Sequence, residues 1–517
     1  MTTAAVLSGL AMAVAVALGV GLSAGSAAGA TVAGRDSGTR VQAAGAGGGQ
    51  PVNVTFWGNG QAVPASFFGL SIEYDELHKY EQSGVMFDRV LRMLRPGAGH
   101  ELTLRLGGKS ADHMLWEPNP KTAPSLKSLP RGVVELGDTW LNDLADLVKT
   151  QHLRIVLDLN LAVHSPAMAA SFAAAVRQAL PKGALAGLEI GNEPDVYHYQ
   201  PHLTRERVAT TTADTPRNWW SNYSALDYRR DYLTYVRTLH ARLGHMTIGA
   251  PDITRPITQW LTDLTNLGSN NPAFLAIHRY GASGCFASTS SAYPTVPNLL
   301  RNSNAEGLAA SVAPWVRFAH ARGIGLRVSE INSVSCGRDS GVANVFASAL
   351  WATDTLFSMA RVGVNAVSWH IRPGTLNAPF HLVHGRLKAE PELYALAVFK
   401  MMTQGHARLL RSVASNSSSD HLSAWTVKSG RTFRVLLINK GWQTLQVSLR
   451  GIRQVHKAEI RRLTAPGVRA GGGVRFAGQR IGSDALWRGK AHVKTVRLRG
   501  GHYHLRVGPY SMAMVSF

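Results

Sequence analysis

The sequence predicts an α/β protein, a (β/α)8 TIM barrel followed by a C-terminal antiparallel β-sandwich. Three observations lead to this prediction. Between residues 65 and 395, short apolar and β-branched runs alternate with longer helical patterns, which is typical of parallel βα units. These runs number eight, the strand number of a closed barrel. After residue 396 the pattern changes to alternating polar and apolar residues broken by Gly and Ser, which indicates antiparallel strands.

The N-terminal region has the composition of an export signal. An apolar run from Ala4 to Val20 is followed by Ala28-Gly29-Ala30, a small-residue pattern typical of a signal-peptide cleavage site. We therefore expect residues 1–30 to be a signal peptide and the protein to be secreted. Because the first three residues lack a basic side chain, a membrane anchor stays open as the alternative, although stable membrane insertion is not expected.

Two further segments separate this signal from the barrel. Residues 31–50 are rich in Gly and Ala without periodicity, which is typical of a flexible linker. Residues 51–64 begin with the strand-like run PVNVTFW, and we expect this strand to join the sandwich. The barrel over 65–395 and the sandwich over 396–517 complete the predicted domain organisation.

The barrel prediction rests on runs whose length suits a strand and on helical patterns between them. Helical patterns cover 138–149, 224–243 and 342–362, and Ser224 with Asp227 forms a capping-box pattern at the start of the second. The eight predicted strands are Phe67–Tyr74, Glu101–Gly108, Arg154–Leu161, Ala184–Asn192, His245–Asp252, Phe274–Tyr280, Gly325–Glu330 and Ala366–His370.

The predicted sandwich carries most of the net positive charge. Its strand-like runs include RTFRVLLIN, QTLQVSLR, KTVRLR and GHYHLRV. The chain has 54 Lys and Arg against 32 Asp and Glu, a formal net charge of +22, and residues 401–517 hold 20 of the basic residues against three acidic ones. Such a surface favours polyanionic partners, so contact with an acidic polysaccharide is an open expectation beside ordinary solubilising charge. Export and the lack of an aromatic and basic motif for bases argue against nucleic acid.

The sequence gives no support for a metal or a cofactor. It contains no HExxH, no Gly-rich phosphate loop and no CxxC pair, so we expect neither. The two cysteines, Cys285 and Cys336, are too few for a disulfide scaffold. In an exported protein they could form one bridge, with two unpaired thiols as the alternative.

Two glutamates stand where a barrel places its active site, at the C-terminal ends of the strands. Glu193 follows the fourth predicted strand in LEIGNEPDVY, and Glu330 ends the seventh in GLRVSEINSVSCG. Glu has no special turn chemistry, which leaves a functional reason for its position. Carboxyl groups about 5 Å apart suit double displacement at a sugar carbon. We expect Glu330 to be the nucleophile and Glu193 the acid/base, with Asn192 donating to a sugar 2-hydroxyl.

These motifs resemble those of known glycosidases. Asn-Glu-Pro on strand four with a second Glu on strand seven resembles clan A of the retaining glycoside hydrolases. The segments FGLSIEY, LRLGGKSAD, HRYG and SEINSVSCG are similar to glycoside hydrolase family 79, which contains β-glucuronidases and heparanase. The resemblance covers roughly residues 51–517, and it implies a barrel joined to a sandwich built from both ends of the chain.

The resemblance also implies roles for further residues. Glu73 matches an acidic residue that contacts the sugar at the cleavage site, and Arg105 is placed to hold the nucleophile. Tyr280 matches a tyrosine that hydrogen-bonds the nucleophile. Arg105 and Tyr280 could instead be structural partners of buried acids. Lys109 and Ser110 follow the second strand and could reach the substrate, although Lys109 could equally be a solvated charge.

The segment after the nucleophile departs from the heparanase-like pattern. Relatives of that type carry Tyr and Gly five and six residues after the nucleophile, where this chain has Ser335 and Cys336, followed by Gly337. The pattern resembles the fungal-type β-glucuronidases, so Ser335 and Gly337 are expected beside the substrate. Cys285 and Cys336 follow strands six and seven, and a bridge between these neighbouring loops could brace the pocket wall.

The leading functional expectation is a secreted, retaining β-glucuronidase that removes terminal β-linked glucuronic acid, or its 4-O-methyl form, without a cofactor. An endo-acting, heparanase-like enzyme is one alternative, and a β-xylosidase or arabinofuranosidase is another. A third is a non-catalytic polyanion-binding surface protein. Trp219 and Trp220, after Glu193, could stack on a sugar face or pack beneath their own loop.

Overall fold

The computed structural model describes residues 50–95, 97, 101–116, 134–199, 222–415, 421–450 and 455–517. Residues 49–517 form one compact unit. The predicted signal peptide (1–30), the predicted linker up to residue 49, and Trp219 with Trp220 lie outside the described residues.

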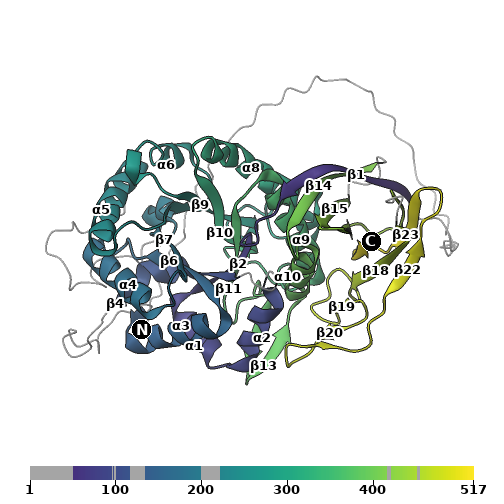
Figure 1. Cartoon of the computed structure of the whole chain (residues 1–517), viewed down its shortest axis with the longest axis horizontal. Helices are drawn as coiled ribbons and strands as arrows, with labels where there is room; N and C mark the ends of the chain where they lie inside the picture. The colour runs from purple at the N-terminus through teal and green to yellow at the C-terminus, as the bar shows by residue number, and fades with distance from the viewer. Residues whose placement is uncertain are drawn as a thin grey trace, which may run out of the picture. The chain divides into compact units, whose positions relative to one another are not determined.

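Eight parallel strands close into a barrel, as the sequence predicts (Figure 1). They follow one another around the barrel in chain order, and the last pairs with the first. Each matches one of the eight predicted strands, with ends that differ by a few residues. The strands are β2 (Phe68–Glu73), β3 (Leu102–Gly107), β6 (Leu153–Leu159), β7 (Leu185–Ile190), β8 (Ile248–Ile253), β9 (Phe274–Ser283), β10 (Gly325–Ser335) and β11 (Ala366–Ile371).

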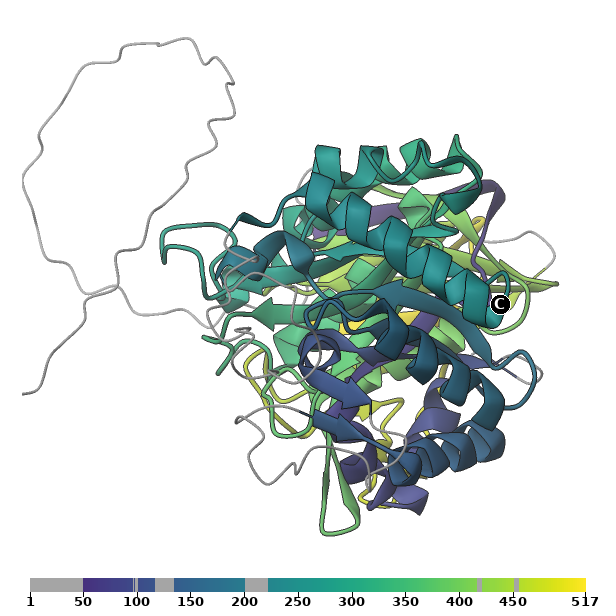
Figure 2. The same ribbon diagram turned by 90° about the vertical axis from the view of Figure 1, so that its left-hand side faces the viewer.

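Helices cover the outside of this barrel, because each strand buries one face inward and needs an apolar layer on the other. In Figure 2 the blue and teal helices of residues 138–243 lie over the barrel strands. None of the helices in the described ranges is long and apolar enough to cross a membrane. The helices are α1 (Leu77–Glu81), α2 (Val85–Leu94), α3 (Asp138–Gln151), α4 (Pro166–Ala179), α5 (Ala225–Leu243), α6 (Thr258–Thr262), α7 (Val296–Leu300), α8 (Asn302–His320), α9 (Phe346–Val362) and α10 (Pro391–Met402).

The start of α5 confirms the capping box expected from the sequence. The Ser224 hydroxyl accepts a hydrogen bond from the backbone N–H of Asp227, and the Asp227 carboxylate accepts one from the backbone N–H of Ser224. Two N–H groups that the helix itself cannot satisfy are thereby paired. The chain therefore leaves the segment after β7 and enters α5 at a defined residue.

The C-terminal region forms a ten-stranded sheet that folds over on itself. Tyr503 in β23 and Phe517 after β24 have ring centroids 5.3 Å apart, although their strands lie far apart in the order of the sheet. An apolar cluster fills the space between the two layers. The strands are β1 (Gln50–Ala62), β14 (Ala407–Ser415), β15 (Leu422–Ser429), β16 (Thr432–Asn439), β17 (Leu445–Arg450), β18 (Lys457–Thr464), β19 (Arg475–Phe476), β22 (Lys494–Arg497), β23 (His502–Val507) and β24 (Ser511–Ser516).

The N-terminal strand β1 completes this sandwich. It pairs antiparallel with β14 and parallel with β17, so the sheet is not wholly antiparallel as the sequence had suggested. The parallel pair arises because β1 comes from the other end of the chain and needs no hairpin to reach its neighbour. In Figure 1 the purple β1 lies beside the green β14. The remaining strands form short two-stranded sheets: β4 (Met114–Trp116) with β5 (Val134–Leu136), β12 (Phe380–Val383) with β13 (Arg386–Ala389), and β20 (Arg480–Ile481) with β21 (Trp487–Arg488).

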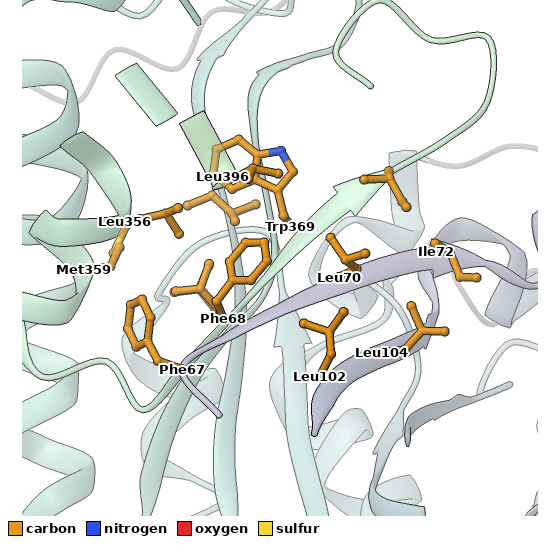
Figure 3. Close-up of a cluster of buried hydrophobic side chains, with 14 of the residues drawn as sticks. Phe67, Phe68, Leu70, Ile72, Leu102, Leu104, Leu356, Met359, Trp369 and Leu396 are labelled. Atoms are coloured by element: carbon orange, nitrogen blue, oxygen red, sulfur yellow. The ribbon is translucent and has the colours of Figure 1, made fainter. Parts of the chain in front are cut away.

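Barrel and sandwich share one hydrophobic core through α9 and α10. Every residue of α9 from Phe346 to Ala360 is buried, since the helix lies between barrel strands and the sheet. Phe357 of α9 stacks on Trp425 of β15 with ring centroids 5.5 Å apart. Figure 3 shows the barrel side of this core, where Leu356 of α9, Leu396 of α10 and Trp369 of β11 gather around Phe68 of β2. The barrel and the sandwich are therefore packed together through these two helices.

A buried ion pair fastens this contact. Lys440, after β16, pairs with Asp354 of α9, and both side chains are buried. The same carboxylate accepts hydrogen bonds from the Ser423 hydroxyl at 3.0 Å and the Trp425 indole N–H at 2.8 Å. Because these three donors are removed from water, each depends on the carboxylate for its hydrogen bond.

We predict that Asp354→Ala lowers the free energy of unfolding by about 3–5 kcal/mol, because it leaves a buried ammonium group unpaired. Denaturant unfolding followed by tryptophan fluorescence measures this. The matched control is Glu459→Ala, which removes the exposed partner of Arg461 on the same sheet and is expected to change stability by about 0–1 kcal/mol. Equal destabilisation by the two substitutions would contradict the role given to Asp354.

Candidate active site

Glu193 and Glu330 meet at the C-terminal mouth of the barrel. Glu193 follows β7, the fourth barrel strand, and Glu330 lies in β10, the seventh. A carboxylate oxygen of Glu193 and one of Glu330 lie within 4.8 Å of each other. Glu330 is buried, whereas the Glu193 side chain is 25% exposed. The structure therefore brings together the two glutamates that the sequence places at separate strand ends.

The backbone at Glu193 adopts a conformation that few side chains tolerate. Its φ angle is +51°, in the left-handed region that favours Gly or Asn. The Glu193 N–H donates to the carbonyl of Asp252 at 2.9 Å, and the N–H of Asn192 donates to the Asp112 carboxylate at 3.0 Å. These bonds hold the turn after β7 in place. Side chains held in such a strained backbone conformation cluster at functional sites.

Arg105 of β3 lies at the centre of the polar cluster. Its guanidinium group is fully buried and donates to four carboxylates from four other strands. The distances are 2.8 Å to Glu189 and 3.2 Å to Glu330, with Asp158 at 3.0 Å and Asp252 closer still. Burial of a guanidinium group costs several kcal/mol of folding free energy unless its N–H groups are paired. Arg105 therefore needs these carboxylates as hydrogen-bond acceptors, and in turn it fixes their positions.

Glu330 is held by three neighbours. The Tyr280 hydroxyl donates to its Oε1 at 2.6 Å, Arg105 Nη1 lies 3.2 Å from its Oε2, and His370 Nδ1 lies 3.6 Å from the same oxygen. Burial alone would raise the pKa of Glu330. The charges of His370, His278 and Arg105 and the hydrogen bond from Tyr280 outweigh burial and lower this pKa to about 2. Glu330 is therefore ionised at neutral pH.

His278 of β9 connects the second glutamate to the cluster. Its Nδ1 lies 2.9 Å from Glu193 Oε1, and its Nε2 lies 3.0 Å from Asp252 Oδ1. Burial lowers the pKa of His278, but the charges of Asp252 and Glu330 raise it well above its ordinary value. The imidazole is thus a cation that donates to Glu193 on one side and faces Asp252 on the other.

Burial and neighbouring charges shift the pKa values of the other acids of the cluster in opposite directions. Burial raises the pKa of Asp252, but Arg105 and His278 lower it below its ordinary value. Burial raises the pKa of Asp158 well above its ordinary value, and burial with the Asp252 charge raises the pKa of Glu189 to about 7. The carboxylates of Asp252 and Glu330 therefore stay ionised beside the cationic groups of Arg105 and His278.

Glu73, at the end of β2, joins the cluster through His370. Its carboxylate accepts from the Ser110 N–H at 2.7 Å and lies 3.8 Å from His370 Nε2. The Ser110 hydroxyl donates to the Gly107 carbonyl and accepts from the Tyr74 N–H, so Ser110 orients Glu73. Lys109 is exposed in the 3-10 turn over Gly108–His113. Its direct contact with a substrate stays a prediction.

The amide of Asn192 has a defined orientation. Its Oδ1 accepts from Arg105 Nη2 at 3.1 Å, and an arginine can only donate, so the amide NH2 faces the other way. This is the orientation that a donor to a sugar hydroxyl requires. Asp112 stabilises it from below, since its buried carboxylate accepts from Tyr197 as well as from the Asn192 backbone.

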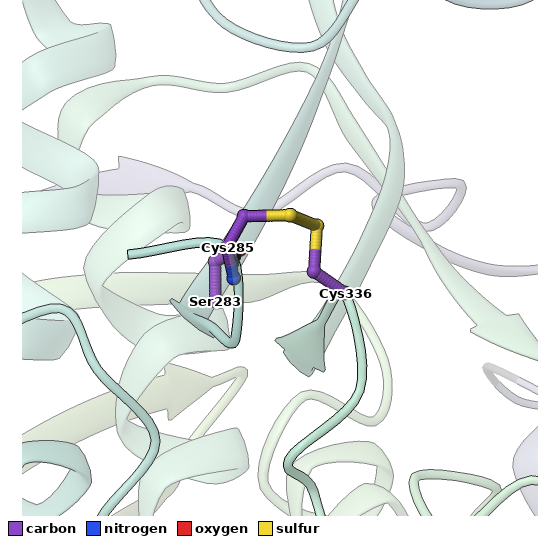
Figure 4. Close-up of a disulfide and its surroundings, with 3 residues drawn as sticks. All are labelled: Ser283, Cys285 and Cys336. Atoms are coloured by element: carbon purple, nitrogen blue, oxygen red, sulfur yellow. Dashed lines mark hydrogen bonds between the residues drawn. A yellow bond between two sulfur atoms is a disulfide. The ribbon is translucent and has the colours of Figure 1, made fainter. Parts of the chain in front are cut away.

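A disulfide between Cys285 and Cys336 joins the segments after β9 and β10, as Figure 4 shows. The backbone beside it is close-packed, because the Gly284 N–H donates to the Ser335 carbonyl at 2.9 Å. A side chain at Gly284 would meet the Gly337 carbonyl at 2.5 Å. Ser335 and Gly337 thus lie in the cross-linked wall. Their contact with a substrate stays a prediction.

One group among the described residues has the composition of a metal site. Glu193, His278 and Glu330 offer ligand atoms within 4.8 Å of one another. These atoms already form hydrogen bonds. His278 donates to Glu193, and Glu330 accepts from the Tyr280 hydroxyl. A protonated imidazole cannot ligate a metal, and the raised pKa of His278 favours that form. The cluster therefore fits proton handling better than metal binding.

Several residues of the cluster were not identified from the sequence. Asp158, Glu189, Asp252, His278 and His370 all lie in buried barrel strands. The available signal was a charged or imidazole side chain inside an otherwise apolar strand. Such a side chain must find a partner when it is buried.

Comparisons with known proteins show the fold. No family model and no curated protein matches the sequence. Among solved structures, the chain is similar to a 4-O-α-L-rhamnosyl-β-D-glucuronidase from Fusarium oxysporum 12S, with a TM-score of 0.73 and 16% identity over 90% of this chain and 100% of that one. It is also similar to a GH51 arabinofuranosidase from Xanthomonas axonopodis pv. citri (TM-score 0.62, 15% identity, 90% and 99% covered). The catalytic domain of GH30 xylanase C from Talaromyces cellulolyticus has a TM-score of 0.52 at 13% identity, with 90% and 99% covered. The chain thus has the fold of these glycoside hydrolases.

We predict that Tyr280→Phe raises the pKa of Glu330 by about 1–2 units, because a hydrogen bond to a charged group is worth about 1.5–3 kcal/mol. The pKa of the wild-type carboxyl, about 2, lies below the range in which the variant titrates. Carbon-detected NMR of the labelled Glu330 side chain measures the change. Tyr232→Phe is the control, since its hydroxyl donates to the Asn270 carbonyl. An unchanged titration in the Tyr280 variant would show that this hydroxyl does not stabilise the ionised form of Glu330.

Proposed function

We propose that the protein is a retaining glycoside hydrolase in which Glu330 is the nucleophile and Glu193 the acid/base. The observation that carries the proposal is the approach of their carboxylate oxygens to within 4.8 Å. Retaining glycosidases have carboxyl groups about 5–5.5 Å apart, whereas inverting enzymes need about 6.5–9.5 Å to admit a water molecule.

The environments of the two glutamates support this division of roles. Glu330 is buried, ionised and held by Tyr280 and Arg105, which leaves a fixed carboxylate to attack the anomeric carbon. Glu193 is more exposed and touches the cluster through His278. It can reach the leaving oxygen and then the incoming water, as an acid/base must.

The reaction proceeds in two displacements. Glu330 forms an ester with the anomeric carbon while Glu193 gives its proton to the glycosidic oxygen, and the aglycone leaves as an alcohol. Glu193, now a carboxylate, then removes a proton from water, and the resulting attack on the anomeric carbon releases Glu330. The NH2 group of Asn192 donates to the sugar 2-hydroxyl. Glu73, fixed by Ser110, accepts from another sugar hydroxyl.

The proposed substrate is a β-linked glucuronic acid at the end of a glycan. Two features support this choice: the sequence resemblance to β-glucuronidases, and the fold similarity to the Fusarium rhamnosyl-glucuronidase, whose name gives its substrate. Secretion, as expected from residues 1–30, would place the enzyme with extracellular glycans. The disulfide agrees with an oxidising compartment.

We predict that the wild type releases p-nitrophenol from the β-glucuronide but not from the β-glucoside, β-xyloside or α-arabinofuranoside. Glu330→Gln is expected to lose this release, because the amide is a poor nucleophile. Absorbance at neutral pH measures the rates. Release of p-nitrophenol from the arabinofuranoside or the xyloside instead would show that the proposed substrate is wrong, while the proposed two-glutamate mechanism would still hold. Silence on all four, with an unsulfated glucuronate polymer cleaved internally, would indicate an endo enzyme.

We predict that Glu193→Ala slows hydrolysis of glycosides with poor leaving groups by about 10²–10⁴-fold. An activated aryl glycoside still reacts in the first step. Added azide restores turnover, because this anion attacks the ester without a general base, whereas water needs Glu193 to remove its proton. Single-turnover kinetics and detection of the glycosyl azide measure both steps. Equal loss for every leaving group without azide rescue would contradict the acid/base role of Glu193.

A further inference from the structure

A groove of about 700 Å³ lies where the N-terminal strand crosses the base of the barrel. It is lined by residues 57–61 of β1, 409–413 of β14, Ala424 and Trp425 of β15, and Arg361 of α9, and we call it the bulge groove. Its volume falls within the range of about 300–1,000 Å³ that is usual for ligand sites. The groove therefore has room for a short segment of a larger ligand.

An irregularity in β1 shapes this groove. The register between β1 and β14 shifts between Trp57 and Gln61, and Gly58 and Gly60 adopt φ angles of +83° and +71°. Arg408 fixes the bulged backbone by donating to the carbonyls of Asn59 and Gly60 at 2.7 and 2.6 Å. The bulge is thus anchored, and a strand without it would continue straight along the sheet.

The groove combines indole rings with guanidinium groups. Trp57 and Arg411 are direct cross-strand partners, so their side chains leave the same face of the sheet. Trp57 is 46% exposed, which is unusual for a tryptophan. On the opposite wall, Arg361 lies over the Trp425 ring at 4.9 Å, and the Trp425 N–H is bound by Asp354.

This composition suits an anionic sugar chain. Indole faces pack against the C–H faces of sugar rings, and guanidinium groups bind carboxylate or sulfate groups in pairs of hydrogen bonds. Glu306 lies 3.7 Å from Arg361, but both side chains are about half exposed, so this pair is weak. The strong excess of basic residues after residue 401 adds a long-range attraction for the same kind of ligand.

The bulge groove is separate from the catalytic cluster. Arg361 lies at the end of α9 that leads into β11, and Gln61 lies just before β2. Both positions are at the N-terminal ends of barrel strands, whereas Glu193 and Glu330 lie at the C-terminal ends. A ligand in this groove therefore does not occupy the site of hydrolysis.

We propose that the bulge groove is a second, non-catalytic binding site for an anionic oligosaccharide, with Trp57 stacking on a sugar ring and Arg411 and Arg361 binding its acidic groups. The proposal goes beyond hydrolysis and does not depend on it. Together with an enzyme active site, such a groove would hold the protein on an acidic glycan while the barrel acts on another segment.

The test is calorimetric titration of the full chain carrying Glu330→Gln, which prevents turnover of the probes. The probes are an unsulfated heparosan octasaccharide, a heparin octasaccharide and neutral cellohexaose. We expect anionic probes to bind more tightly than cellohexaose. In Trp57→Ala/Arg411→Gln, we expect the affinity of the anionic probes for the groove to fall by about tenfold or more. Any binding of the same probes to the active site is expected to be unchanged.

The matched control is Trp442→Ala/Arg506→Gln, which removes one exposed indole and one exposed guanidinium group of the sandwich outside the groove. We expect it to change the affinity less than twofold. Binding of both anionic probes would show that carboxylates suffice, and binding of heparin alone would show that sulfate is needed. Either outcome supports the site.

Three results would overturn the proposal: equal weakening in the control, no binding of either anionic probe, or equally tight binding of cellohexaose. Thermal melting of both double variants shows whether they are folded. Because binding is measured on a variant without turnover, failure of the proposed hydrolysis and failure of the groove are distinguishable.

Discussion

The buried guanidinium group of Arg105 is the interaction on which the rest of the site depends. It lies inside the mouth of the barrel, without contact with water, and it donates to carboxylates of four other strands. Removal of that charge would leave four acids crowded in a medium of low polarity, where like charges repel strongly. The same fork of N–H groups fixes Asn192 and, through Asp252, sets the charge of His278. Arg105 therefore influences both the positions and the charge states of the side chains around it.

This arrangement gives two glutamates of the same chemistry different environments, which suit the different tasks proposed for them. Glu330 is surrounded by donors and cations, which favour its ionised form. Glu193 stands on a strained turn at the edge of the cluster, with partial access to solvent and one contact to a protonated imidazole. Catalysis by double displacement needs one carboxylate that stays charged and one that exchanges a proton. The surroundings of Glu330 and Glu193 differ because different barrel strands supply the side chains next to each of them.

The sequence predicts the barrel well, because its strands follow from local patterns. It also points to Glu193 and Glu330, which the structure brings close together. Eight apolar runs predict eight strands, and a Glu where Gly or Asn would suit a turn indicates a functional position. The full set of contacts made by Arg105 does not follow from local patterns. Arg105 was expected to hold the nucleophile, but its contacts with Asp158, Glu189 and Asp252 join strands that lie 53 to 147 residues away along the chain. The parallel pairing of β1 with β17 also depends on tertiary contacts that no local pattern contains. The fold, shared with glucuronidase, arabinofuranosidase and xylanase structures, does not choose a substrate.

The short separation of the two carboxylates implies hydrolysis with retention of configuration, and the stereochemistry of the reaction tests this most directly. Proton NMR of the anomeric region, recorded as an aryl β-glucuronide is cleaved, shows which anomer of the sugar forms before mutarotation. With these oxygens within 4.8 Å of each other, we predict that the β anomer appears first, since two displacements retain configuration. Initial appearance of the α anomer would contradict it, because a single displacement would require a water molecule between the two carboxylates.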